Sequence, residues 1–307
     1  MKDFKEHIYG CLFGQAVGDA LGLGTECMTK EEVIKYYPNG LTDYSQIIVD
    51  YHRRKWQKGE WTDDTDMMLC IANALIEDKG VDLTHIARNF KAWFNDNPRG
   101  IGSQTCKLLV VKEYVEKPFE ASELIWKMSR KEAAGNGGLM RTSVVGLLPN
   151  DVAKHAEDIC RLTHFDPRCI GSSVIWSEII HSLVYDDREL SVNDIIDIAN
   201  RYDERIKPYV VQAKESDFEE LVLDDERAGY TLTTLMVALW CYFHINSFEE
   251  GLFEVVNAGG DADTNAAVAC SMLGAKYGYS AIPKSLIDGL VDRERLESVC
   301  KRIRSDQ

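Results

Sequence analysis

The sequence has little positive charge, no closely paired cysteines and no long uninterrupted hydrophobic run. Its 307 residues carry 35 lysines and arginines against 50 aspartates and glutamates, which gives a formal net charge of −15. Because binding to a phosphate backbone needs clustered lysine and arginine, this deficit argues against a nucleic-acid partner. A small phosphate-bearing ligand is still compatible with it, provided that metal ions or backbone amides neutralise the ligand.

The cysteines and the N-terminal segment indicate the compartment. The nine cysteines are scattered and odd in number, and none belongs to a C-x-x-C pair. This distribution is typical of reduced thiols. The apolar N-terminal patch is interrupted by Asp3, Glu6 and Asp19, and no small-residue cleavage pattern follows it. We therefore expect a cytoplasmic protein that has no signal peptide and no contact with a membrane.

The apolar residues, 45% of the chain, are enough for a substantial core, and most of them recur at helical spacing. Alternating strand patterns are nearly absent, so the sequence predicts an all-α fold. No linker rich in proline, glycine or serine divides the chain, which favours a single domain over residues 1–307. The acidic segment 208–226 is expected to be a surface excursion. Besides a helix around Leu232, helices are expected at about 3–21, 64–78, 82–95, 103–116, 151–163, 168–185, 191–204, 262–278 and 292–304.

The stretch "GEWTDDTDMML", residues 59–69, gathers Asp63, Asp64 and Asp66 beside an apolar run. One aspartate at the start of a helix caps free backbone amides and is worth roughly 1 kcal/mol. Three carboxylates in one loop repel one another, and this repulsion outweighs the capping gain. A bound cation would remove the conflict.

A second acidic stretch, "NAGGDADTNAAVAC" at 257–270, again places acids and a threonine at the start of a helix. If the two helix starts face each other, they form a cage of hard oxygen donors. Such donors, without cysteine or histidine, suit Mg²⁺ or Mn²⁺ and are numerous enough for two ions. We therefore favour a divalent-metal site over ordinary helix capping. The proposed ligands are Thr62, Asp63, Asp64, Asp261, Asp263 and Thr264.

A third cluster, "AAGNGGLMRTS" at 133–143, contains Asn136 and Gly137 in a glycine-rich turn. Such a turn can present backbone amides to a phosphate, although glycine-rich turns more often only reverse the chain. His164 in "LTHFDP" could cap a helix or contact a ligand, but a single histidine is more often structural.

Together these segments resemble the ADP-ribosylglycohydrolase family, which includes enzymes that remove ADP-ribose from arginine. The resemblance covers nearly the whole chain, and the paired TDDT and GGDADTNA signatures are its most specific part. It implies a compact all-α fold with a binuclear magnesium or manganese centre in a cleft. The matching segments are, in order, "GCLFGQAVGDALGLGTE", "WTDDTDMML", "NPRGIGSQT", "GNGGLMRTSVVGLL", "THFDP", "AGYTLTTLMVALW" and "GGDADTNAAVACSMLGAKYG".

The resemblance also implies functional roles. The six proposed ligands match the metal ligands of the family, and Glu26 matches an acid close to the ribose that is bonded to the modified residue. Asn136 and Gly137 match the loop that holds the diphosphate, and His164 lines the same cleft. The resemblance implies that the substrate is an ADP-ribosylated protein, with arginine as the favoured modified side chain, and that the product is free ADP-ribose.

For the reaction we hypothesise that a metal-activated water attacks the anomeric carbon of the ribose through an oxocarbenium-like state. Asp261 or Asp263 would orient this water, and Glu26 would contact the ribose or assist proton transfer. The sequence does not distinguish which acid performs which step.

One motif departs from the family pattern. Many arginine-type members carry an acid in an "Asp-Ile-Gly" motif where this chain has Gly100-Ile101-Gly102, a segment that we expect to contact the substrate. Asp96, Glu26 or a metal-bound carboxylate would then replace that acid. The alternatives are hydrolysis of ADP-ribosylserine or O-acetyl-ADP-ribose, metal-dependent phosphohydrolysis, and an inactive, crystallin-like family member.

Overall fold

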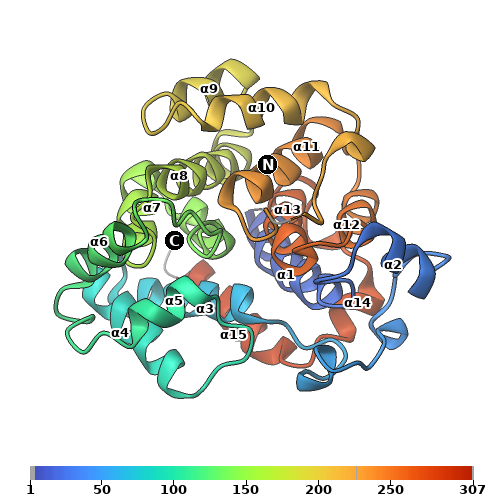
Figure 1. Ribbon diagram of the computed structural model, residues 1–307, viewed down its shortest axis with the longest axis horizontal. Helices are drawn as coiled ribbons and strands as arrows, with labels where there is room; N and C mark the ends of the chain where they lie inside the picture. The colour runs from blue at the N-terminus through green and yellow to red at the C-terminus, as the bar shows by residue number, and fades with distance from the viewer. Residues whose placement is uncertain (1–3, 226, 306–307) are drawn as a thin grey trace.

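A computed structural model describes residues 4–225 and 227–305, and within them the all-α prediction is confirmed (Figure 1). In place of any strand, this part of the chain has one isolated β-bridge, between Gly135 and Tyr230. The single domain over 1–307 stays a prediction. The α-helices are α1 (Phe4–Gly22), α2 (Lys30–Tyr36), α3 (Asp63–Asp78), α4 (Leu83–Asn95), α5 (Ser103–Leu109), α6 (Pro118–Met128), α7 (Val152–Arg161), α8 (Pro167–His181), α9 (Val192–Ala199), α10 (Ile206–Glu215), α11 (Thr231–His244), α12 (Phe248–Val256), α13 (Ala262–Tyr277), α14 (Lys284–Asp288) and α15 (Arg293–Ser305).

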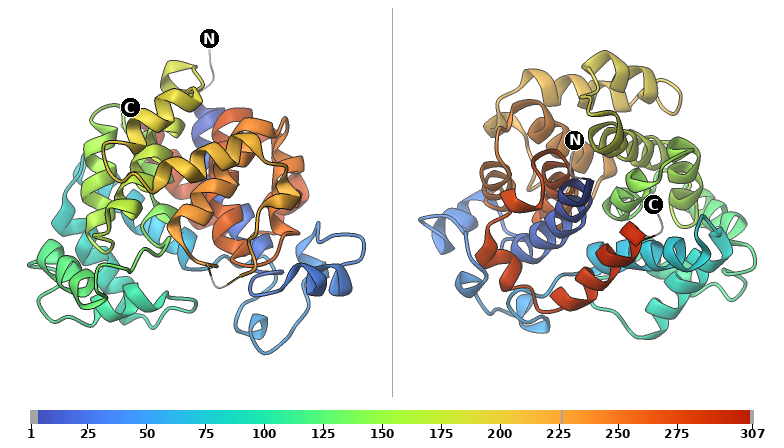
Figure 2. Two further views of the ribbon diagram at one scale, coloured as in Figure 1. Left: turned by 45° about the horizontal axis from the view of Figure 1, so that its top comes forward. Right: turned by 180° about the vertical axis from the view of Figure 1, so that it is seen from behind.

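At the centre of the fold, helices α1 and α13 lie side by side and antiparallel (Figures 1 and 2). A Cβ atom at Gly18 would stand 2.3 Å from the carbonyl oxygen of Ala266, and one at Gly22 would stand 2.4 Å from that of Ala262. Because only glycine permits so close an approach, the end of α1 is fixed beside the start of α13. The glycines of this contact recur at every fourth position of α1, at Gly10, Gly14, Gly18 and Gly22.

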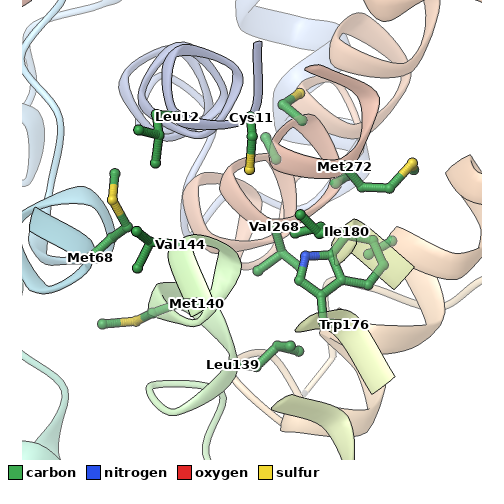
Figure 3. Close-up of a cluster of buried hydrophobic side chains, with 14 of the residues drawn as sticks. Cys11, Leu12, Met68, Leu139, Met140, Val144, Trp176, Ile180, Val268 and Met272 are labelled. Atoms are coloured by element: carbon green, nitrogen blue, oxygen red, sulfur yellow. The ribbon is translucent and has the colours of Figure 1, made fainter. Parts of the chain in front are cut away.

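The hydrophobic core packs around this pair. Figure 3 shows Trp176 of α8 beside Val268 of α13, with Leu12 of α1 and Met68 of α3 in the same cluster. The Trp176 side chain is fully buried, and its Nε1 donates a hydrogen bond to the Ser271 hydroxyl at 3.1 Å. Burial of these side chains holds the helices that supply the acidic residues in one fixed arrangement.

Three segments differ from the expected secondary structure. The helix expected over 191–204 ends at Ala199. The surface excursion expected at 208–226 is wrong in its first half, which belongs to α10. This helix buries Ile206, Val210 and Ala213 at helical spacing, and the acidic residues that follow obscure that pattern. The helix expected over 103–116 ends at Leu109, because the chain turns and buries Tyr114 instead. None of the helices among the described residues is both long and apolar enough to cross a membrane.

Candidate metal centre and cleft

The starts of α3 and α13 meet, as the sequence predicts for a cage of oxygen donors. The Thr62 hydroxyl, directly before α3, donates to Asp64 Oδ2 at 3.1 Å. The Thr264 hydroxyl in the first turn of α13 donates to the same oxygen at 3.3 Å. Donors two hundred residues apart in sequence therefore converge on one carboxylate.

This carboxylate is only half satisfied. Asp64 is 2% exposed, and its Oδ1 has no hydrogen-bond partner. A buried polar atom without a partner is costly, and a buried carboxylate oxygen is especially so. A bound cation would satisfy this oxygen, so Asp64 fits a metal ligand.

A further buried acid, Asp19 of α1, fixes the start of α3 through hydrogen bonds. Its carboxylate accepts hydrogen bonds from the Thr62 amide at 2.9 Å, the Thr65 amide at 3.0 Å and the Thr65 hydroxyl at 2.6 Å. In the sequence, Asp19 stands out only as an interruption of the apolar N-terminal patch, and this role was not predicted. A single acid on the apolar stripe of a buried helix was the available signal.

The loop before α13 places a second group of acids. Gly260 adopts φ +65°, and a Cβ atom there would lie 2.0 Å from the Leu223 carbonyl oxygen, so only glycine fits this turn. The Cys27 amide donates to the Gly260 carbonyl oxygen at 2.7 Å. This contact holds Glu26 against the turn, and carboxylate oxygens of Glu26, Asp261 and Asp263 lie within 4.8 Å of one another.

The Asn136 side chain, expected from the sequence to contact a diphosphate, forms hydrogen bonds within the protein. Its side-chain amide donates to Asp261 Oδ2 at 2.6 Å and to the Thr234 hydroxyl at 2.9 Å. The glycine-rich turn is itself anchored, since the Asn136 backbone amide donates to the Gly229 carbonyl oxygen at 3.0 Å. In this structure the Asn136 side chain therefore orients an acidic residue of the centre.

The centre contains several buried carboxyl groups close to one another, and their pKa values are raised. Burial, with Asp19 nearby, raises the pKa of Asp63 to about 8. Burial also raises the pKa of Asp261 to about 6, with a smaller effect from Glu26, and it raises the pKa of Asp64 well above its usual value. Among the described residues no lysine or arginine forms an ion pair with these three acids. Divalent cations bound by these carboxylates would relieve their repulsion.

Asp66, the third acid of the "TDDTD" stretch, does not belong to the centre. Its carboxylate accepts hydrogen bonds from the indole Nε1 atoms of Trp61 and Trp93, each at 3.1 Å, and pairs with Arg295 at 2.9 Å. The expectation that all three carboxylates repel one another in one loop is therefore wrong for Asp66, which ties α3 to α15.

A cleft of about 830 Å³ opens beside the centre, within the range of roughly 300–1,000 Å³ usual for ligand pockets. Six of the seven proposed metal and catalytic residues line it, and all five proposed substrate-binding residues do as well. Thr62 is the remaining proposed ligand, and it reaches the centre through its bond to Asp64. The cleft-lining residues among those proposed are Glu26, Asp63, Asp64, Asp261, Asp263, Thr264, Gly100, Gly102, Asn136, Gly137 and His164.

His164 is buried and uncharged. Burial, together with the Arg141 guanidinium, lowers the pKa of His164 to about 3. Its Nδ1 forms a hydrogen bond with the Thr163 hydroxyl at 2.7 Å. A Cβ atom at Gly137 would lie 2.8 Å from His164 Cε1, so the glycine lets the turn pack on the imidazole ring. His164 can thus offer the cleft an uncharged surface or a hydrogen bond, but no positive charge.

The segment that departs from the family motif lies directly on the centre. Gly100 has φ +85°, and a Cβ atom there would stand 2.7 Å from Asp63 Oδ1. A side chain at this position would therefore displace the Asp63 carboxylate. Asp96 is not among the residues that line the cleft and instead lines a separate pocket beside Trp93 and Arg99. It is consequently poorly placed to replace the missing acid.

Comparison with known proteins gives a consistent result. A family model described as ADP-ribosylglycohydrolase matches residues 1–307. An ADP-ribosyl-[dinitrogen reductase] glycohydrolase of Rhodospirillum rubrum is 28% identical, covering 93% of this chain and 91% of the relative. An ADP-ribosylarginine hydrolase, Tri1, of Serratia proteamaculans is 24% identical over 96% of this chain and 78% of its own length. A solved structure entitled ADP-ribosylglycohydrolase-related protein complex matches with a TM-score of 0.79 and 26% identity, covering both chains completely.

Proposed function

Because this chain belongs to the ADP-ribosylglycohydrolase family, we propose that it hydrolyses the glycosidic bond between ADP-ribose and a modified protein side chain. Arginine is the side chain that we favour, since two relatives that match over more than nine-tenths of this chain are named for ADP-ribosylarginine hydrolysis or for dinitrogen-reductase glycohydrolysis. The observation that carries the proposal is the half-satisfied, buried Asp64 at the meeting point of two acidic helix starts.

We propose that the centre holds two Mg²⁺ or Mn²⁺ ions. Its donors are carboxylate and hydroxyl oxygens, which these hard cations prefer. When bound, such ions would lower the pKa of a coordinated water and orient the ribose hydroxyls. The proposed ligands are Thr62, Asp63, Asp64, Asp261, Asp263 and Thr264.

The acidic side chains of the centre have distinct proposed roles in the reaction. Asp261, held by the Asn136 amide, and Asp263 orient the attacking water. Glu26 lies within 4.8 Å of both and is partly exposed to the cleft, so it is placed to contact the ribose or to transfer a proton at the leaving group. Asp19 fixes the start of α3 through its hydrogen bonds with Thr62 and Thr65.

The rest of the cleft would bind the ADP part of the substrate. The turn around Gly137 and the segment Gly100–Gly102 bring backbone close to the cleft, where amides can contact a diphosphate. His164 adds an uncharged wall.

A second candidate substrate class is favoured by Gly100. The missing acid at this position removes a carboxylate that could contact a guanidinium leaving group, which an O-linked substrate does not need. ADP-ribosylserine and O-acetyl-ADP-ribose are therefore the alternatives to test beside arginine.

The test follows free ADP-ribose by mass spectrometry from matched peptides ADP-ribosylated on arginine or serine, and from O-acetyl-ADP-ribose. Each reaction is run with Mg²⁺ and with a chelator, and with an Asp261→Asn and Asp263→Asn double variant. We expect Mg²⁺-dependent release that the double variant loses, with the arginine peptide cleaved fastest. Faster cleavage of the serine peptide would assign an O-linked substrate. Release of AMP would instead indicate phosphohydrolysis, and no release from any substrate would favour a protein without catalysis.

A further inference from the structure

Glu26 and two neighbouring residues, Cys27 and His52, form a group of three potential metal ligands of different chemistry. His52 Nε2 lies 2.6 Å from Glu26 Oε2, and Cys27 Sγ lies 3.8 Å from Glu26 Oε1. The ligand atoms of all three residues lie within 4.8 Å of one another. A tetrahedral ion with metal–ligand bonds of about 2.0–2.3 Å holds its ligands roughly 3.3–3.6 Å apart, so only small side-chain shifts are needed.

The two segments that carry these residues are fixed to each other by one buried side chain. Arg53, next to His52, is 5% exposed and donates from Nε to the carbonyl oxygens of Leu23 at 3.0 Å and Gly24 at 2.9 Å. Its Nη2 donates to the Glu26 carbonyl oxygen. The loop that carries His52 is therefore attached directly to the segment that carries Glu26 and Cys27, and the three ligands are preorganised.

The donor set differs from that of the acidic centre. A thiolate, an imidazole and a carboxylate form a typical set for Zn²⁺, whereas Mg²⁺ disfavours thiolate. Cys27 is exposed, so an ion can arrive from solvent and a water can complete the coordination. We propose that Cys27, His52 and Glu26 form a binding site for a transition-metal ion such as Zn²⁺. Binding replaces the Cys27 thiol proton, which is released to solvent.

This site has a consequence for the proposed hydrolysis, and that consequence rests on the proposed function. Glu26 belongs both to this group and to the group with Asp261 and Asp263. When Zn²⁺ holds the Glu26 carboxylate, Glu26 is no longer free to contact the ribose or transfer a proton. Zn²⁺ therefore inhibits the enzyme at a site separate from the Mg²⁺ ligands.

The binding itself is tested without any activity measurement. The magnesium-loaded protein is titrated with Co²⁺, and the near-ultraviolet thiolate-to-metal charge-transfer band is recorded, followed by competition with Zn²⁺. We expect one equivalent to produce the band, Zn²⁺ to remove it, and Cys27→Ser to abolish it. Cys106→Ser, at another partly exposed cysteine, is the matched control and keeps the band. Absence of the band in the unaltered protein, or its persistence in Cys27→Ser, overturns the site.

Inhibition is tested on the same proteins under saturating Mg²⁺, with ADP-ribose release as the readout. Cys27→Ser is expected to keep the uninhibited rate and to need more than about 100-fold more Zn²⁺ for half-inhibition, because losing a ligand costs more than losing a group that only orients one. Equal Zn²⁺ sensitivity of Cys27→Ser and the unaltered protein overturns inhibition through this site. If no substrate is hydrolysed at all, the proposed function fails, while the cobalt titration still decides whether the metal site exists.

Discussion

Two buried aspartates at helix starts show opposite ways of tolerating a charge in the interior. Asp166, before α8, is fully buried and accepts hydrogen bonds from Arg168 Nε at 2.8 Å, Arg168 Nη2 at 2.8 Å and Trp126 Nε1 at 2.9 Å. Asp64, in the first turn of α3, is equally buried, but its neighbours are other acids and one of its oxygens has no partner.

The difference shows that an acid at a helix start is not by itself a sign of function. Asp166 has its cation in the chain and needs nothing from solution, so it stabilises the fold. Asp64 has no such cation in the chain, which supports the proposal that it binds a metal ion from solution. The missing partner, rather than the carboxylate, identifies the functional site.

Asp64→Asn tests whether Asp64 is a functional residue, and it has the largest expected effect. We expect the rate of ADP-ribose release at saturating Mg²⁺ to fall more than about 100-fold, beyond what loss of a group that only orients a ligand costs. The free energy of unfolding in a chelator should stay equal or rise, because a buried unpaired charge is removed. Urea unfolding beside the kinetic assay measures both. A large loss of stability would show that Asp64 is structural instead.

Arg168→Met tests whether the ion pair between Asp166 and Arg168 stabilises the fold. It leaves the Asp166 carboxylate buried without its cation, and we expect a loss of roughly 3–5 kcal/mol in the free energy of unfolding, with or without Mg²⁺. Adding Asp166→Asn to this variant should restore much of the loss. Denaturant unfolding of the single and double variants provides the measurement, and a mild effect of the single variant would contradict the assigned role.

The stability of the protein should depend on both pH and Mg²⁺ through the buried acids of the centre. The pKa values of Asp63 and Asp261 are raised in the folded protein to about 8 and about 6, above the value of about 4 for an unfolded chain. Their contribution to stability is therefore full below about pH 4 and is lost as pH rises through these values. Mg²⁺ should restore it at high pH, by about 2.7 kcal/mol at one hundred times its Kd.

Thermal unfolding at pH 5.5 and pH 8.0, with Mg²⁺ and with a chelator, measures this effect. The rise in Tm on adding Mg²⁺ should be larger at pH 8.0. Asp64→Asn serves as the control and should show a smaller rise at both values. An equal response at both pH values in the unaltered protein would argue against carboxylates as the ligands.

Asn136→Ala should have the smallest effect of the four changes. It removes the amide that orients Asp261, and we expect metal affinity to fall about 10–100-fold while the rate at saturating metal changes less. Isothermal titration with Mn²⁺ measures the affinity. An increased KM for substrate with unchanged metal affinity would instead support the diphosphate contact expected from the sequence.

Much of the candidate site could be proposed from the sequence because its chemistry is local. Asp63, Asp64, Asp261, Asp263 and Thr264 stand in two short stretches at helix starts, and their side-chain types already indicate hard oxygen donors. The segments whose structure was predicted wrongly, around α10 and after α5, lack such clear local signals. In α10 the apolar spacing is short and lies beside acidic residues.

The sequence by itself determined the helical fold class and the chemistry of the proposed ligands, because spacing and side-chain type are properties of short segments. Only the tertiary structure decided which acids converge. In the folded chain Asp66 pairs with Arg295, Asp19 accepts a hydrogen bond from the Thr62 amide, and His52 contacts Glu26. These outcomes depend on how closely α1 and α13 approach and on where distant loops pack, and such distances are set by many contacts acting together.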